Sequence, residues 1–348
     1  MWIDLVLHTE FRNSFQPGEV SQRTRNILHV NSEKVPINCN VSDFDIEQCA
    51  IDLDLDSDMY FSDPSNFVAG NVHRSTILWQ KIIDRENEEA LDWICNGVDV
   101  NKYLQHVNGT FWGVHYDHSY PPPRQFQNAS NCRQHTQFLK NEILSRLQSG
   151  AISLVGKVGE VDPPHIVSPI TVEPTKPRMC INLMYLNCFM KDTPFNLETL
   201  VDVPRTVQGG SFLTKLDDKS GYDNVFVTNS SRKLLGFQWG GYYFCCNTLP
   251  FGWKNSAYVY HTLNLQAMSF LRKKSISCLL YIDDRLIESF HGYVPPNLNN
   301  PFMRAQVAIR YVVRFSVSLG YFLNIDKSIF LPTQSIVFLG MIIDSAKR

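Results

Sequence analysis

Two pairs of neighbouring acidic residues carry the most chemistry in this sequence. Asp217 and Asp218 follow a short apolar run, and Asp283 and Asp284 interrupt the apolar segment 279–287. Either pair alone fits an acidic hairpin tip, since Asp is a common turn residue. Two strand ends that carry carboxylates can also meet at one edge of a sheet, where the like charges repel unless a cation lies between them.

Clustered carboxylates of this kind favour a magnesium site. Hard oxygen ligands with few other protein donors suit Mg²⁺, because this ion keeps waters and substrate phosphates in its remaining positions. Two such ions, a few ångströms apart, activate an attacking hydroxyl and stabilise a departing pyrophosphate. The two acidic pairs therefore predict a site for two Mg²⁺ ions, with Mn²⁺ as a substitute.

The segments around these acids alternate between helices and hairpins. From apolar spacing and from Ser, Pro and Gly boundaries we expect helices over residues 136–147, 256–274 and 301–320. We expect strands from residue 215, over 151–172 around an Asp-Pro-Pro turn, over 277–290 around a tight turn, and over 323–344. This order predicts an α+β fold with one largely antiparallel sheet.

Composition and hydrophobic patterning divide the chain into three regions. We predict an acidic, partly disordered N-terminal region over 1–70, a helical extension with a Pro-rich linker over 71–130, and a compact domain over 131–348. The expected core of the middle region is Trp79, Ile82, Ile83, Leu91, Trp93 and Ile94. The spacing of Asp52, Asp54 and Asp56 is that of a calcium loop, but Ser57 stands where such a loop needs glycine, so we expect no calcium site.

Charge follows the same division. Residues 1–130 hold 9 Lys and Arg against 19 Asp and Glu, whereas residues 131–348 hold 23 against 15. The resulting balances are −10 and +8, within a net charge of −2. The positive part has the sign of a surface that grips a phosphate backbone, and ordinary surface charge is an equally good explanation.

The nine cysteines show no CxxC pair, which favours reduced thiols over a disulfide framework or a zinc site. No apolar run is long enough to span a membrane, and the start of the chain lacks the basic region of a signal peptide. We therefore expect a nuclear or cytoplasmic protein with no membrane partner.

Six motifs over about residues 150–345 resemble those of reverse transcriptases, and they stand in the family's order. They are Lys-Pro-Arg at 176–178 with Asn at 182 and Leu-Asn at 186–187, Leu-Asp with Ser-Gly-Tyr at 216–222, Leu-Pro-Phe-Gly at 249–252, Tyr-Ile-Asp-Asp at 281–284, Asn-x-x-Lys-Ser at 324–328, and Phe-Leu-Gly at 338–340. The amino-acid sequences of these motifs are most similar to those of DIRS-type and gypsy-like retrotransposons.

This resemblance implies a right-hand polymerase with fingers and palm, in which helices back an antiparallel palm sheet. It implies an RNA-directed DNA polymerase that uses an RNA template, a DNA primer and dNTPs. We expect this chain to lack a thumb and an RNase H domain. Both would belong to a full-length polyprotein. The alternative is a non-catalytic remnant, or a co-opted nucleic-acid-binding module, that keeps the palm fold.

The resemblance assigns the metal-binding residues. Asp217 and Asp283 would bind both metal ions, Asp284 would be the accessory acid, and the backbone carbonyl of Asp218 a further ligand. These acids, without Asp218, would be the catalytic residues. Asp218 itself departs from the family, which usually has an apolar residue there, and we expect its carboxylate to add charge at the site.

The resemblance also implies a nucleotide pocket and a primer grip. The pocket would comprise Arg178, Asp218, Ser220, Gly221, Tyr222, Phe251, Gly252 and Lys327, and the grip Phe338, Leu339 and Gly340. Arg178 would clamp the triphosphate, Tyr222 would exclude a 2′-hydroxyl, and Lys327 would donate a proton to pyrophosphate. Plainer roles stay open: Tyr222 as a core tyrosine, Arg178 and Lys327 as surface residues, Gly252 as a turn residue, and 338–340 as a core strand turn.

Further departures from the family pattern surround the pocket. Asp223 and Asn224 replace the usual residues after Tyr222, Met184 stands where a basic residue is common, and Thr171 lies where many relatives have a lysine. An RNA-templated RNA polymerase is a weaker alternative, because a bulky Tyr222 disfavours ribonucleotides.

Overall fold

The computed structural model describes residues 67–84, 86–294, 296 and 299–347, all of which belong to one compact unit. Most of the acidic N-terminal region, with the aspartates of the calcium-like loop, lies outside the described residues.

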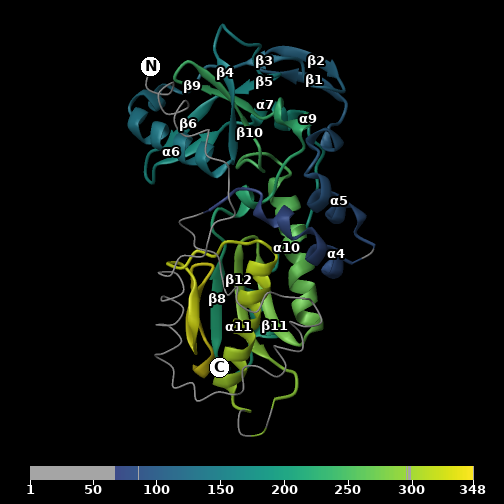
Figure 1. Ribbon diagram of the computed structural model, residues 1–348, viewed down its shortest axis with the longest axis vertical. Helices are drawn as coiled ribbons and strands as arrows, with labels where there is room; N and C mark the ends of the chain where they lie inside the picture. Colours follow the sequence, from purple (N-terminus) through teal and green to yellow (C-terminus); the bar gives the residue numbers. More distant parts are fainter. Residues whose placement is uncertain (1–66, 85, 295, 297–298, 348) are drawn as a thin grey trace. The chain divides into compact units, whose positions relative to one another are not determined.

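A four-stranded antiparallel sheet, in which β8, β11 and β12 are labelled in Figure 1, has both acidic pairs at its strand ends or directly beside them. Its order is β11 (Ile276–Tyr281), β12 (Asp284–Phe290), β8 (Leu213–Asp217) and β13 (Ile329–Thr333). Helices α10 (Ser256–Lys273) and α11 (Pro301–Ser318) pack against it. This arrangement confirms the expected palm sheet backed by helices.

Local sequence explains how the two long helices begin. Pro301 occupies the first turn of α11, where its missing N–H removes no hydrogen bond, and the Asn300 side chain accepts a hydrogen bond from Met303 N. The expected N-cap of α10, Ser256, is instead its first helical residue, and Asn255 takes the cap position. The Ser256 hydroxyl donates to Pro250 O at 2.8 Å, so it ties the helix start to the preceding turn.

A second, mixed sheet corrects the expectation of one largely antiparallel sheet. Its order is β3 (Arg124–Gln125), β5 (Ile166–Ser168), β9 (Gly236–Trp239), β10 (Tyr242–Cys246) and β4 (Ile152–Lys157). The β3–β5 and β5–β9 pairings are parallel, and the other two are antiparallel. The strands expected over 151–172 exist, but β4 and β5 lie apart because β9 and β10 separate them.

The remaining strands form hairpins. They are β1 (Val107–Phe111) with β2 (Val114–His118), β6 (Ile170–Glu173) with β7 (Arg178–Ile181), and β14 (Ser335–Phe338) with β15 (Met341–Asp344). The first hairpin and β3 lie within residues 71–130, so that region is not purely helical. The division of the chain at residue 130 stays a prediction.

The other helices are α4 (Thr76–Ile82), α5 (Glu88–Asn96), α6 (Thr136–Ser149), α7 (Met184–Cys188), α8 (Val203–Thr206) and α9 (Asn229–Arg232). Five of the six expected core residues of the middle region are buried, and Leu91 is half-buried. The Trp79 indole N–H donates to Leu319 O at 3.0 Å. The helical extension is thereby joined to the end of α11.

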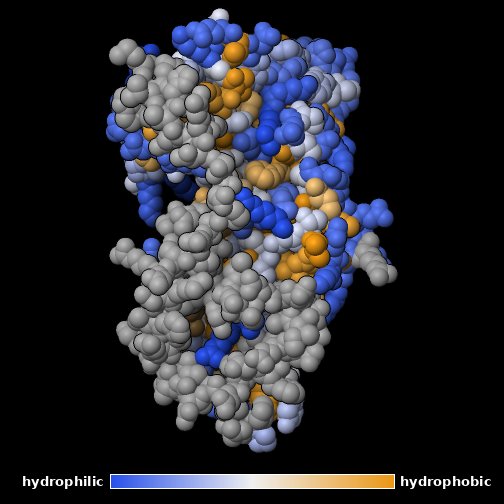
Figure 2. Space-filling view, in the orientation of Figure 1, coloured by the Kyte–Doolittle hydropathy of each residue, from blue (hydrophilic) through white to orange (hydrophobic). Residues whose placement is uncertain are grey.

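Figure 2 shows the described surface in one view as largely hydrophilic, with smaller apolar groups. Within the described part of the chain, no helix is long and apolar enough to cross a membrane, and all seven cysteines are free thiols.

Candidate active site

The register of the palm sheet brings the three predicted catalytic acids to one end of it. Asp217, the last residue of β8, pairs directly with Asp284, the first residue of β12. Asp283 lies in the two-residue turn between β11 and β12. We call Asp217, Asp283 and Asp284 the acidic cluster. The two strand ends that carry carboxylates therefore meet at one edge of the sheet, as the sequence analysis considered.

Burial and mutual repulsion act on the acidic cluster. Burial raises the pKa of Asp283 to about 6, and the charges of Asp284, Asp218 and Asp217 add to this rise. Burial also raises the pKa of Asp217, which Lys327 opposes and Asp284 reinforces. Two lysines balance part of the charge: Lys327 Nζ is 3.6 Å from Asp217 Oδ1, and Lys215 Nζ is 3.6 Å from Asp284 Oδ1.

The chemistry of these donors fits a hard divalent cation. Crowded carboxylates lose their repulsion when a cation lies between them, and Mg²⁺ needs only one or two protein carboxylates beside water and phosphate oxygens. Among the described residues, no three His, Cys, Asp or Glu side chains are arranged so that they could together hold a metal ion, so the three acids do not form a complete site by themselves. The cluster thus fits an open site whose remaining ligands come from solvent and substrate.

The motif at 324–328 packs directly against β8. Asn324 N donates to Asp217 O at 2.8 Å, and Asp217 N donates to the Ser328 hydroxyl at 3.1 Å. These bonds fix the backbone of Asp217 from both sides. Lys327 stays exposed, with its ammonium beside the Asp217 carboxylate, so the structure brings together two motifs that lie over 100 residues apart.

The loop after β8 is tied down by a residue that the sequence analysis treated only as a departure. The Asn224 side-chain amide is buried and donates to three carbonyls, those of Lys219, Ser220 and Gly221, at 3.1, 3.2 and 3.2 Å. Ser220 adopts a left-handed conformation with φ 50°. A Cβ on Gly221 would lie 2.9 Å from the Tyr260 hydroxyl, so only glycine fits there.

The charge of Asp218 raises the pKa of Asp217 and of Asp283, as expected, but its carboxylate also has a buried partner that the sequence analysis did not predict. Its side chain is fully buried and forms a bidentate ion pair with Arg285, with N–O distances of 2.5 and 2.7 Å. Tyr260 OH donates to Asp218 Oδ2 at 2.5 Å. Arg285 thus offsets part of the charge of this carboxylate, which points away from Asp217 because successive residues of an extended segment point to opposite faces. A role for the Asp218 carbonyl as a metal ligand stays a prediction.

Tyr222, Phe251 and Gly252 gather beside the acidic cluster. The Tyr222 ring lies 4.6 Å from that of Phe251 and 5.4 Å from that of Tyr260, measured between centroids. Burial and then the charge of Asp283 raise the pKa of Tyr222 to about 12. Phe251 is 58% exposed, so this aromatic group has one open side. A half-buried ring at that place suits the predicted pocket wall better than a core tyrosine.

Gly252 joins this pocket to the predicted fingers motif. Its φ of 92° is left-handed, and a Cβ there would lie 3.1 Å from Ile181 O. The Asn187 side chain donates to Gly252 O at 2.7 Å and accepts from Lys254 N at 2.9 Å. Asn187 therefore holds the turn that carries Phe251.

Two predicted groups lie away from the acidic cluster. Arg178 begins β7 and is exposed, and no contact among the described residues joins it to the cluster. Phe338 is fully buried against Leu213 and Leu286 of the palm sheet, and Leu339 and Gly340 form the turn between β14 and β15. Phe338 is a core residue in this structure; a grip on primer by residues 338–340 stays a prediction.

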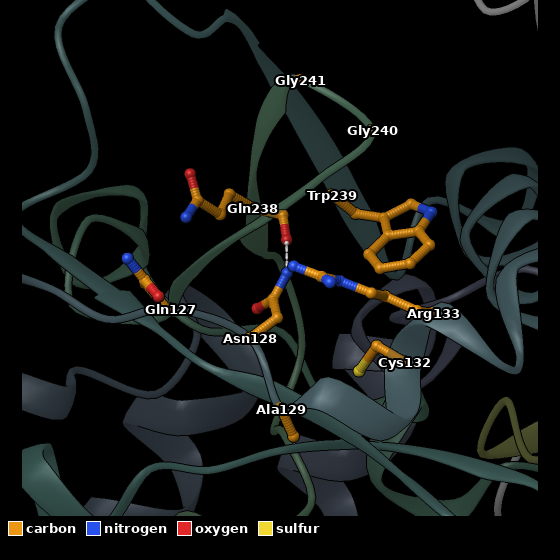
Figure 3. Close-up of a pocket in the computed structure, with 9 residues that line it drawn as sticks. All are labelled: Gln127, Asn128, Ala129, Cys132, Arg133, Gln238, Trp239, Gly240 and Gly241. Atoms are coloured by element: carbon orange, nitrogen blue, oxygen red, sulfur yellow. Dashed lines mark hydrogen bonds between the residues drawn. The ribbon is translucent and has the colours of Figure 1, made fainter.

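A polar pocket of about 330 Å³ lies in the mixed sheet region and includes none of the predicted site residues (Figure 3). Asn128 Nδ2 donates to Gln238 O at 2.8 Å across it, and Arg133, Trp239 and Gly241 are among its lining residues. Sequence analysis gave no signal for this pocket.

The palm sheet with acids at one end, its backing helices and the adjoining aromatic rings define a right-hand polymerase of the fingers-and-palm kind. The comparisons agree: residues 172–343 match the family profile of reverse transcriptase (RNA-dependent DNA polymerase). The chain therefore contains a domain of the reverse transcriptase family.

Curated relatives are viral. The enzymatic polyprotein of Figwort mosaic virus (strain DxS) is 24% identical over 169 residues, which cover 49% of this chain and 23% of that protein. The genome polyprotein of Petunia vein clearing virus (isolate Shepherd) is 27% identical over 168 residues, or 48% of this chain and 7% of that protein. The chain spans less than a quarter of the length of these relatives.

Solved structures show the same fold at low identity. The foamy viral protease-reverse transcriptase in complex with RNA/DNA hybrid has a TM-score of 0.55 and 16% identity, covering 96% of this chain and 37% of that one. A selenomethionine-labelled mutant of the prototype foamy virus protease-reverse transcriptase has a TM-score of 0.51 and 17% identity, covering 80% and 36%.

Proposed function

We propose that the protein is an RNA-directed DNA polymerase that adds dNTPs to a DNA primer on an RNA template by a two-metal mechanism. The observation that carries this proposal is the meeting of Asp217, Asp283 and Asp284 at one end of the palm sheet, beside the rings of Tyr222 and Phe251.

Each residue in that pocket then has a defined task. Asp217 and Asp283 would hold two Mg²⁺ ions, with Asp284 as the accessory acid, and Mn²⁺ would be able to replace Mg²⁺. The ions, when bound, activate the primer hydroxyl and stabilise the leaving pyrophosphate. The backbone around Ser220 and Gly221 cradles the phosphates, Tyr222 supports the sugar, and Lys327 protonates pyrophosphate. Arg178, an exposed residue at the start of β7, clamps the triphosphate through its fork of N–H donors.

The test is Mg²⁺-dependent incorporation of dNTPs on a primed RNA template. We expect incorporation by the parent chain and a loss of at least about a hundredfold in Asp283→Asn, since this change removes a ligand shared by both ions. Binding of the primed template should survive. Binding without incorporation by the parent chain would show the alternative instead, a nucleic-acid-binding module that keeps the palm fold.

We further propose that the chain belongs to a DIRS-type or gypsy-like retrotransposon and acts in the nucleus or cytoplasm. The support is the wording of the six motifs and the free cysteines of the described residues. The genomic DNA around the coding sequence tests this origin: a retrotransposon reading frame with thumb and RNase H segments downstream is expected, and a viral genome organisation would contradict it.

A further inference from the structure

We propose that Asp218 and Arg285 are positioning residues for the acidic cluster. Their buried ion pair clamps β8 to β12 at the end where the acids stand, and it thereby sets how Asp217 lies relative to Asp283 and Asp284. The inference rests on the proposed function, because it assigns these two residues to the same metal site. Neither side chain would touch a metal ion or a substrate.

The register explains why this pair acts on the acids. Asp218 follows Asp217, Arg285 follows Asp284, and Asp217 and Asp284 are direct partners in the sheet. Because side chains alternate along a strand, Asp217 and Asp284 share one face while Asp218 and Arg285 share the other. Both guanidinium N–O distances, 2.5 and 2.7 Å, are short, and both side chains are at most 1% exposed. Such a fork fixes orientation as well as distance.

A third residue carries the constraint to the turn that bears Asp283. Asn264 of α10 accepts from Arg285 Nη2 at 3.0 Å and donates to Ile282 O at 3.0 Å. Ile282 has a φ of 54°, a left-handed conformation that a β-branched residue adopts only when its surroundings impose it. The ion pair and the amide therefore hold the turn in a shape that its own sequence disfavours.

Two tyrosines complete the buried network. Tyr260 OH donates to Asp218 Oδ2, and the Arg285 guanidinium lies 4.8 Å from the centre of the Tyr321 ring. The same Tyr260 hydroxyl faces Gly221, so the network also touches the loop after β8. Every polar atom of the Asp218 carboxylate has a partner, which a buried charge requires.

The experiment measures Mn²⁺ binding by electron paramagnetic resonance beside kcat and KM for dNTPs. Arg285→Lys keeps the charge but loses the fork and the contact with Asn264. We expect a folded variant with metal affinity and kcat each lowered about tenfold or more, and with KM for dNTPs and template affinity near those of the parent. A folded Arg285→Lys variant with the parent's Mn²⁺ affinity and kcat overturns the proposal.

A double variant, Asp218→Leu with Arg285→Met, separates positioning from stability. Apolar side chains of similar size often restore the stability that one unpaired buried charge removes. We expect its melting temperature to approach that of the parent while Mn²⁺ affinity stays low. If both recover, the ion pair only fills space in the core and does not position the acids. The matched control is Arg272→Lys, which makes the same change in a different ion pair, that of Arg272 in the last turn of α10 with Glu198. This variant should leave Mn²⁺ affinity unchanged.

The metal readout separates this inference from the polymerase proposal. A parent chain that binds Mn²⁺ through Asp283 but incorporates no nucleotide contradicts the polymerase function, and the affinities of the variants still decide the role of the pair. A parent chain that binds no Mn²⁺ overturns both proposals.

Discussion

At the scale of single residues, two neighbouring acids have different environments. Asp217 belongs to the acidic cluster, whereas Asp218 is buried against Arg285. Strand alternation could have been applied to the sequence, and it predicts that two adjacent acids diverge. The partner could not be predicted, because Arg285 is 67 residues away and Tyr260 lies on a helix between them.

The raised pKa of Asp283 predicts how stability depends on pH. Because its pKa is about 6 in the folded chain and near 4 in the unfolded one, the folded chain keeps a proton that the unfolded chain has lost. Without divalent metal, stability should therefore fall as pH rises from about 4 to about 6. Mg²⁺ should restore it above that range, since it binds the ionised form.

Urea midpoints across that pH range, with and without Mg²⁺, check this expectation. In Asp283→Asn the fall should be smaller, and Mg²⁺ should add little. An equal fall in the parent and the variant would assign the effect to other groups, of which Asp217 is the first, since its pKa is also raised by burial.

The packing of Tyr222 predicts sugar discrimination. Its ring is held between Phe251 and Tyr260, so a smaller side chain opens space beside the predicted sugar position. Tyr222→Ala should lower the ratio of kcat/KM for dNTPs to that for rNTPs by about tenfold or more. Tyr222→Phe keeps the ring and should keep the ratio. If the ratio of kcat/KM for dNTPs to that for rNTPs is similar in Tyr222→Ala and the parent, Tyr222 only packs in the core and does not discriminate between sugars.

At the scale of elements, the sequence pattern predicted helices and hairpins correctly where the contacting residues are close in sequence. The β11–β12 hairpin and helices α6, α10 and α11 were expected from apolar spacing and terminal residues, and the structure contains them within a few residues of the expected ends. The mixed sheet was missed because its parallel pairs join residues 124–125, 166–168 and 236–239. Nothing in a short segment specifies a partner so distant in sequence.

The loop after β8 gives a prediction at this scale. Asn224 holds three carbonyls of that loop, so Asn224→Ala should leave them without partners and lower the free energy of unfolding by about 1–3 kcal/mol. Incorporation should fall with it, because the loop carries Ser220 and Gly221. Urea unfolding measures the change. The exposed Asn141 offers the control, since Asn141→Ala should change stability by less than about 0.5 kcal/mol; equal losses in the two variants would deny the loop this support.

At the scale of the whole molecule, charge separates along the chain. Residues 131–348 carry a balance of +8, and residues 1–130 one of −10. The positive part includes the palm sheet and the β6–β7 and β14–β15 hairpins. If that part holds template and primer, its cations replace counterions on phosphates, and affinity must depend on salt.

Binding of a fluorescent primed RNA template in EDTA tests this. A plot of the logarithm of affinity against that of salt concentration should have a slope of about −2 or steeper, because each phosphate contact contributes about −0.7 to −0.9. Affinity should then fall more than about tenfold between about 50 and 200 mM salt. Asp283→Asn should keep the slope, since without metal its carboxylate contacts no phosphate. A slope near zero would mean that the positive balance is spread over the surface and that the chain holds nucleic acid, if at all, without counterion release.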